Sequence, residues 1–271
     1  MLKCDEGSQF ALGVERRYVD RTMASFVGRK DMLRKLRKNL DVDWTARGLP
    51  VVVVGEPGTG KTSLLCAFCH YYRKLNPDAT ILPHIVFASP RSTDIVETLL
   101  RLGHMLQEQY GCVWDPDDSN YQALKDSFKE LLVTVGREAL AIGDKILLLV
   151  DGVDSLDAAF GAHSLDWLPK FLPPGVRVLL SWASDSAPAV TVASWDPTWP
   201  SVDMIPLNVE ERRRIVTRQL AYVRSFAVMH ATALTRISSL QLLSKEINGH
   251  PNGLAADESR SWKTSVFDHR L

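Results

Sequence analysis

A glycine-rich segment that runs into a lysine and a threonine carries the residue types most directly suited to chemistry. It matches the pattern G-x-x-x-x-G-K-[ST] of a phosphate-binding loop, with the residues Gly55, Glu56, Pro57, Gly58, Thr59, Gly60, Lys61 and Thr62, followed by Ser63. Glycines allow the backbone N–H groups to converge on an anion, and the following helix adds its positive N-terminal end. Lys61 is expected between the β- and γ-phosphates, and Thr62 is expected to offer its hydroxyl to Mg²⁺. The pattern predicts nucleotide binding, with a merely structural glycine turn as the alternative.

A second group of candidate residues ends the apolar stretch Ile146-Leu-Leu-Leu-Val-Asp151-Gly-Val-Asp154. Asp151 would meet Mg²⁺ across the sheet from the phosphate loop, so Asp151 and Thr62 are the candidate metal ligands. Asp154 could orient a water for attack on a γ-phosphate, which makes both aspartates catalytic candidates. The alternative for Asp151 is a simple helix or turn cap, and a turn-stabilising role for Asp154 is an equally good interpretation.

These residues require a sheet that brings them to one edge. Four consecutive valines, 51–54, stand directly before the phosphate loop and indicate a strand buried on both faces, as in a parallel sheet. Pro83 indicates that its strand lies at an edge, because proline cannot donate to a ladder. The alternation of strands and helices predicts an α/β fold with a parallel sheet of about five strands flanked by helices. The other predicted strands are 80–88, 145–151, 176–182 and 201–205, and the predicted helices include 30–40, 63–74, 95–110, 121–140 and 165–172.

Composition narrows the function classes. The chain has 271 residues, with 32 Lys and Arg against 32 Asp and Glu. Zero net charge argues against bulk electrostatic binding to nucleic acid or to an anionic membrane. No apolar run approaches the ~20 residues of a membrane span, and the N-terminus lacks the layout of a secretory signal. We therefore expect an intracellular, cytoplasmic protein.

The cysteines include a spaced pair that needs separate treatment. Cys66-Ala-Phe-Cys69-His70 matches the haem-attachment pattern C-x-x-C-H, and its C-x-x-C also matches a redox or zinc half-site. The pair falls on the helix after the phosphate loop, where one or more of its side chains should face the sheet. No second C-x-x-C completes a zinc site. We expect a buried, inert pair.

The motifs together resemble a known group of proteins. Phe26-Val-Gly-Arg29, the phosphate loop 55–62 and Leu149-Val-Asp-Gly-Val-Asp154 resemble the nucleotide-binding module of the STAND class of P-loop NTPases. Within that class the chain is most similar to the NACHT-type module of nephrocystin-3 and related tetratricopeptide-repeat proteins. The resemblance covers roughly residues 26–254 and is carried mainly by the two phosphate motifs; segments 87–94 and 207–216 add weaker support.

The resemblance implies an ATP-preferring, Mg²⁺-dependent signalling switch of AAA+-like architecture, in which ATP or ADP controls the opening or assembly of a larger protein. By this resemblance Val27 contacts adenine, and Ser181 or Ser184 senses the γ-phosphate. A Gly-x-Pro element, Gly249-His-Pro251 here, would close a helical lid over the nucleotide, although a plain helix stop explains the triplet equally well. The implied domains are an N-terminal arm at 1–25, a P-loop nucleotide-binding domain at 26–206, a partial helical lid at 207–255 and a polar C-terminal tail at 256–271.

Some features depart from the family pattern. Ser155 stands where many NACHT modules have a further acidic residue, and the strand that ends at Ser181-Trp-Ala-Ser184 lacks the arginine often found there. We therefore expect slow or absent ATP hydrolysis, at most that of a weak ATP hydrolase. The winged-helix module and repeats of the family do not follow Pro251, which suggests a short isoform, a fragment or a reduced paralogue.

Two other functions stay open on the sequence alone. One is a truncated protein-interaction module with a vestigial nucleotide site. The other is a P-loop small-molecule kinase that would use Arg91 and Arg101, although no arginine-rich lid follows the fourth strand. The expected partners are ATP or ADP and other proteins, with oligomerisation left open and nucleic acid and membrane not expected.

Overall fold

A computed structural model of the chain describes residues 17–19, 22–23, 26–89, 91–195, 199–221 and 223. The chain divides into two compact units, Met1–Gln219 and Leu220–Leu271, and the description below concerns the first. Nothing in the structure tests the domain boundaries predicted at residues 25, 206 and 255, which stay predictions.

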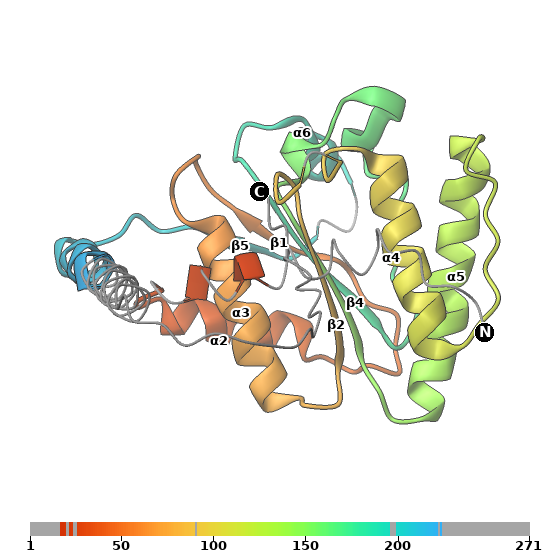
Figure 1. Ribbon diagram of the computed structural model, residues 1–271, viewed down its shortest axis with the longest axis horizontal. Helices are drawn as coiled ribbons and strands as arrows, with labels where there is room; N and C mark the ends of the chain where they lie inside the picture. The colour runs from red at the N-terminus through yellow and green to blue at the C-terminus, as the bar shows by residue number, and fades with distance from the viewer. Residues whose placement is uncertain are drawn as a thin grey trace, which may run out of the picture. The chain divides into compact units, whose positions relative to one another are not determined.

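A parallel sheet of five strands in the order β2-β3-β4-β1-β5 forms the centre of this unit (Figure 1). All its pairings are parallel, which confirms the predicted α/β fold. β2 lies at an edge, as its proline indicated. The strands are β1 (Val51–Val54), β2 (Thr80–Ile85), β3 (Ile146–Asp151), β4 (Val176–Trp182) and β5 (Ser201–Asp203).

Helices cover both faces of the sheet. Because side chains alternate along a strand, Val51 and Val53 pack on the α2 and α3 side, whereas Val52 packs on the α4 and α5 side. Figure 1 shows these two layers on opposite sides of the strands. The helices are α2 (Lys30–Leu40), α3 (Lys61–Leu75), α4 (Ile95–Tyr110), α5 (Tyr121–Ala141) and α6 (Ala187–Ala193), with 3₁₀ turns η1 (Val153–Ser155) and η2 (Ala159–Ser164).

Side-chain caps fix where several helices begin. Asp94 accepts hydrogen bonds from the backbone N–H groups of the first turn of α4, and Asn120 does the same for α5. A further helix, residues 209–221, begins with a reciprocal capping box. There the Asn208 backbone N donates to Glu211 Oε2 at 3.0 Å, and the Glu211 N donates to Asn208 Oδ1 at 2.8 Å. The rest of the predicted lid lies outside the described residues.

The helix predicted at 165–172 is wrong. Leu165 has a φ of 60°, and the segment forms turns. Leu172 exchanges two backbone hydrogen bonds with Gly48, at 3.1 and 2.8 Å. Its amide therefore bonds to Gly48 in place of a carbonyl one helical turn earlier. Four apolar residues of the segment are nevertheless buried in the core, so the helix-like pattern arises from tertiary packing; they are Leu165, Trp167, Leu168 and Leu172. The strands predicted at 80–88 and 201–205 end earlier, at Ile85 and Asp203.

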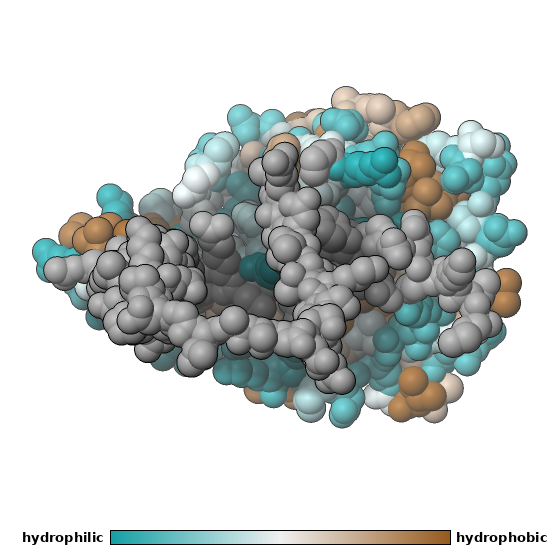
Figure 2. Space-filling model, viewed as in Figure 1, coloured by the Kyte–Doolittle hydropathy of each residue, from teal (hydrophilic) through white to brown (hydrophobic). Residues whose placement is uncertain are grey.

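The described surface is mixed in polarity. Figure 2 shows hydrophilic side chains over most of the coloured area of one face, with apolar ones in small groups among them. Within the described residues, no helix combines the length and the apolar character needed to cross a bilayer.

Gly103 sets how closely α4 approaches the segment before α5. A Cβ at Gly103 would lie 2.1 Å from the ring of Trp114. That ring packs edge-on against Phe128 and donates its Nε1 hydrogen to Ser127 Oγ at 2.8 Å, so it has little room to move. Gly103 therefore allows the Trp114 ring to pack closely against α4, although glycine lowers the stability of a helix.

We predict that Gly103→Ala destabilises the fold. The gain in helix propensity of about 1 kcal/mol is smaller than an overpacking cost of roughly 1–3 kcal/mol. Urea denaturation measures the difference, with Gln109→Ala on the exposed face of α4 as the control. A Gly103→Ala protein as stable as the control would show that the Trp114 ring can give way.

Candidate phosphate-binding site

The phosphate loop connects β1 to α3 at the carboxyl edge of the sheet. Gly58 and Gly60 have φ values of 78° and 92°, which side-chain-bearing residues rarely adopt. Gly55 is buried, and a Cβ there would lie 2.5 Å from Met204 Cβ. A residue with a side chain at position 55 would therefore push the loop away from the segment that follows β5.

Hydrogen bonds within the loop hold its shape. The Thr59 hydroxyl donates to the Glu56 carbonyl at 2.7 Å. The Lys61 ammonium donates to the carbonyls of Gly55 and Glu56 at 2.6 and 3.2 Å, so the cation lies over its own loop. Glu56, Pro57 and Gly58 are exposed, while Thr59, Gly60, Lys61, Thr62 and Ser63 are half-buried.

Asp151 is the buried centre of the site. Its carboxylate, only 4% exposed, accepts a hydrogen bond from Ser181 Oγ at 2.6 Å and another from the Thr62 hydroxyl. Burial raises the pKa of Asp151, while these two hydrogen bonds and the charge of Lys61 act in the opposite direction. The structure thus brings together a carboxylate, two hydroxyls and an ammonium, from β3, β4 and the start of α3. Oxygen donors of this kind are the ligands that Mg²⁺ prefers.

Ser181 and Ser184, the two candidates for a phosphate sensor, differ in their surroundings. Ser181 is fully buried, and its Oγ also accepts the Gly152 backbone N–H at 2.9 Å. The hydroxyl therefore ties β4 to the turn after β3. Ser184 is exposed in the turn beyond β4.

Asp154 follows on the turn after β3. Its Oδ2 accepts a hydrogen bond from the Ala183 backbone N at 3.0 Å. This bond connects the turn after β3 to the end of β4. This bond fits the turn-stabilising interpretation, and the water-orienting role stays a prediction.

The Val-Gly-Arg turn lies beside the phosphate loop. The Arg29 guanidinium donates to the Thr59 carbonyl at 3.2 Å, and burial lowers the pKa of Arg29 while the charge of Glu211 raises it. Gly28 has a φ of 83°, and a Cβ there would lie 3.1 Å from Glu211 Oε1. Val27 is half-buried in the same turn. Its predicted adenine contact stays a prediction, and the predicted lid residue Pro251 lies outside the described residues.

Sequence reasoning missed the residues before this turn. Val19 is buried against Cys66 and Ile85, whereas the first 25 residues showed no clear period. The sequence gives little signal for this packing, because its partners lie far along the chain.

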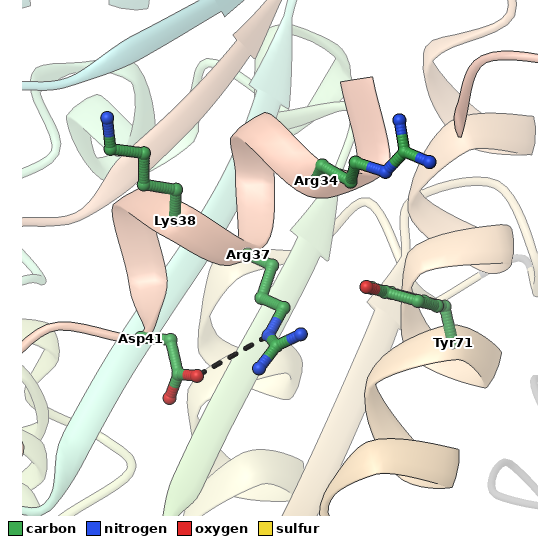
Figure 3. Close-up of a pocket in the computed structure, with 5 residues that line it drawn as sticks. All are labelled: Arg34, Arg37, Lys38, Asp41 and Tyr71. Atoms are coloured by element: carbon green, nitrogen blue, oxygen red, sulfur yellow. Dashed lines mark ion pairs between the residues drawn. The ribbon is translucent and has the colours of Figure 1, made fainter. Parts of the chain in front are cut away.

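A surface depression of about 330 Å³ lies between α2 and α3, far from the phosphate loop (Figure 3). It is lined by Arg34, Arg37, Lys38, Asp41 and Tyr71. Tyr71 is ten residues beyond Lys61, or about 15 Å along the helix. Arg37 Nε pairs with Asp41 at 3.5 Å, and the depression is open and polar.

The cysteine pair is a packing feature. Cys66 and Cys69 are buried free thiols on α3, and burial raises the pKa of Cys66 to about 12. Among the residues that the structure describes, no group of three or more His, Cys, Asp or Glu side chains could hold a metal ion.

Comparison with protein families gives one match. The family model of the NACHT domain matches residues 49–221, well over half of the chain. This range contains the phosphate loop, Asp151, Asp154 and Ser181, and it confirms the NACHT resemblance found in the sequence.

The curated relatives are much longer proteins. NACHT domain- and WD repeat-containing protein 1 of Mus musculus is 30% identical over 162 residues, which are 59% of this chain and 10% of that protein. A TPR repeat-containing protein of Dictyostelium discoideum is 23% identical over 238 residues, 73% of this chain and 14% of that protein. The chain therefore spans about a tenth of the length of these relatives.

Solved structures give distant fold similarities. The Aeropyrum pernix ORC1 protein in complex with DNA aligns with a TM-score of 0.42 at 13% identity, covering 73% of this chain and 50% of that one. Domain III of the Thermotoga maritima replication initiation protein DnaA aligns with a TM-score of 0.41 at 16% identity, covering 76% and 75%.

We predict that Ser181→Ala destabilises the protein by about 1–3 kcal/mol, because it leaves the Gly152 N–H and one Asp151 oxygen buried without their hydroxyl partner. Ser184→Ala, on an exposed residue of the next turn, should change stability by less than about 0.5 kcal/mol. Urea denaturation of both variants measures the difference. Equal stabilities would mean that water replaces the hydroxyl.

Proposed function

We propose a nucleotide-dependent switch function for this chain, which belongs to the NACHT domain family. The chain is a nucleotide-binding module, and in our proposal its ligand is ATP with Mg²⁺. Bound nucleotide would hold the start of the helical lid against the phosphate loop, and its loss would release that helix. The observation that carries the proposal is the convergence of Lys61, Thr62 and Asp151 at the carboxyl edge of the sheet.

The residues present fit a Mg²⁺-bound nucleotide. The curled loop with positive φ at Gly58 and Gly60 presents backbone N–H groups to phosphates, and the dipole of α3 adds to the attraction. Lys61 would exchange its two carbonyl acceptors for phosphate oxygens. Thr62 and Asp151 would hold Mg²⁺, which when bound neutralises phosphate charge.

A continuous set of contacts supports coupling between the phosphate loop and the lid helix. The Arg29 side chain reaches the Thr59 carbonyl of the loop. The Arg218 side chain, on helix 209–221, donates to the Phe26 carbonyl at 3.1 Å. Glu211 at the start of the same helix faces Gly28. A shift of the phosphate loop would therefore change contacts of helix 209–221 through the Val-Gly-Arg turn.

Slow or absent hydrolysis is the part of the proposal that concerns catalysis. Asp154 already uses one carboxylate oxygen to hold Ala183, and Ser155 offers a hydroxyl where a second acid would add charge. Such a site holds a triphosphate better than it activates a water. The kinase alternative gains no support, since Arg101 donates to His84 and Arg91 pairs with Glu97 at 3.7 Å.

The partners proposed are other proteins or other parts of one large protein. The names of the relatives mention WD or TPR repeats. This chain corresponds to about a tenth of the length of those proteins. We propose that the module reports its nucleotide state to such neighbouring parts.

We predict that Mg²⁺–ATP raises the melting temperature of the chain and that Lys61→Ala abolishes the shift. Ligand at about 100 times its dissociation constant adds roughly 2.7 kcal/mol to the stability of the folded state. Mg²⁺–GTP should give a smaller shift. Lys74→Ala, an exposed lysine near the other end of α3, is the control and should respond as the wild type does.

Two results would contradict the proposal. A shift that survives in Lys61→Ala would place the nucleotide elsewhere. No shift in the wild type, with a cooperative melt in every condition, would mean a folded interaction module without a working nucleotide site. ATP turnover in the same samples tests slow hydrolysis, and a rate of several per second would overturn that part.

A further inference from the structure

The solvent-facing side of α2 and α3 is strongly basic. On α2 the apolar residues Met32, Leu36 and Leu40 turn inward and are buried, so the charged positions face solvent. Together the two helices expose seven Lys or Arg residues against a single acidic residue, Asp31. The seven, called the basic face below, are Lys30, Arg34, Lys35, Arg37, Lys38, Arg73 and Lys74.

The helices on the other side of the sheet show no such excess of charge. On α5 three Lys or Arg residues stand against three Asp or Glu residues, and α4 has one Arg against two Glu. The whole chain balances 32 basic against 32 acidic residues. The positive charge of the basic face is therefore local. Charge on a helix surface often serves solvation alone, so the case for a binding surface depends on how the cations are arranged.

A depression of about 330 Å³ between α2 and α3 collects several of these cations (Figure 3). Arg34, Arg37 and Lys38 are spaced by three and four residues, which places them on one side of α2, and all three line the depression. Tyr71 lines it from α3, and Asp41, directly after α2, lines it as well. The basic face thus has a concave centre in which three cations converge.

Asp41 does not cancel this charge. Its Oδ2 lies 3.5 Å from Arg37 Nε, and its Oδ1 lies 3.7 Å from Lys145 Nζ, so two cations share the one carboxylate. Lys38 forms no ion pair within the described part of the chain. The depression therefore keeps an excess of positive charge.

The two arginines are held in place and still have N–H groups to offer. Arg37 is fixed between Asp41 and Tyr71, to which its side chain is hydrogen-bonded. Arg34 pairs with Asp31 at 2.7 Å, but the two side chains are 69% and 94% exposed, and such a pair is weak enough to be exchanged for a ligand. A guanidinium has more donors than one carboxylate oxygen can use. Both arginines can therefore bind a further acceptor.

We propose that the basic face binds an acidic segment of a partner protein, with carboxylates of that segment in the depression between α2 and α3. Arginine forks bind carboxylates through paired N–H groups, and Lys38 adds a point charge. A volume of about 330 Å³ accommodates a few side chains. The proposal does not require nucleotide binding, so it stands or falls separately from the proposed function.

Carboxylates suit this surface better than the backbone of a nucleic acid does. A nucleic acid presents phosphates at short, regular intervals and needs a continuous row of cations. Here Asp31 and Asp41 lie among the cations, where they would repel a phosphate backbone. A peptide can place its few acidic side chains between them.

The test is fluorescence anisotropy of a labelled octapeptide of alternating Glu and Asp, titrated with the full chain. We expect the peptide to bind at about 50 mM salt and to bind more weakly at about 200 mM, because salt screens exposed charges. An octapeptide of alternating Gln and Asn should not bind. Lys38→Glu should lower the affinity about fivefold, since it replaces an attraction by a repulsion, and Lys38→Gln about twofold.

Arg137→Glu is the matched control. It makes the same change in net charge as Lys38→Glu, on an exposed position of α5, which lies on the other side of the sheet. Its affinity for the acidic octapeptide should equal that of the wild type. All three variants change exposed residues, so their melting temperatures should match that of the wild type.

Three results would overturn the proposal. The wild type might bind the acidic octapeptide no better than the neutral one. Arg137→Glu and Lys38→Glu might lose equal affinity, which would mean that only net charge matters. A labelled oligonucleotide of eight thymidines might bind more tightly than the acidic octapeptide and lose affinity in Lys38→Glu, which would make the basic face a nucleic-acid surface.

Discussion

The buried carboxylate of Asp151 is the group whose solvation the rest of the site must replace. At 4% exposure it has lost water on nearly every side, and hydroxyls from Ser181 and Thr62 take the place of that water. These hydroxyls come from β4 and α3, so the carboxylate is satisfied only when β1, β3 and β4 are in register. The site therefore depends on the strand order. Because β4 lies between β3 and β1, Ser181 on β4 lies next to Asp151 on β3.

Two sets of contacts connect the region of the phosphate loop, at the carboxyl edge of the sheet, to other parts of the chain. The loop contacts the Val-Gly-Arg turn through Arg29, and residues 26–28 in turn contact Glu211 and Arg218 of helix 209–221. Through Cys66 and Ile85 it meets the segment around Val19. A ligand that stiffens the loop would therefore bias elements that lie before the nucleotide-binding domain in sequence as well as elements that follow the sheet.

Much of the fold could be predicted because its signals are local. The valines of β1, the glycines of the loop and the cap at Asp94 each act within a few residues, and the bounds of α2 and α4 matched the predicted ranges. The predictions failed where distant partners decide the conformation. Leu172 bonds to Gly48 in place of a helix, and Val19 is buried by residues on α3 and β2 that no local pattern could indicate. For the site, the end of an apolar strand indicated Asp151, and the family resemblance offered Ser181 or Ser184. The bond between Asp154 and Ala183 could not be predicted, because it depends on how two turns meet in space.

Pro83 has a consequence for how copies of this protein can meet. An edge strand normally offers a row of unpaired amides to any extended chain, and such edges lead to strand addition and aggregation. β2 forms one edge of the sheet, and at Pro83 it has no amide hydrogen to offer, while the Pro83 carbonyl accepts from Arg101 at 3.5 Å. Strand addition at the β2 edge would therefore lack one of its backbone hydrogen bonds, which makes this edge of the sheet a poorer template for an added strand.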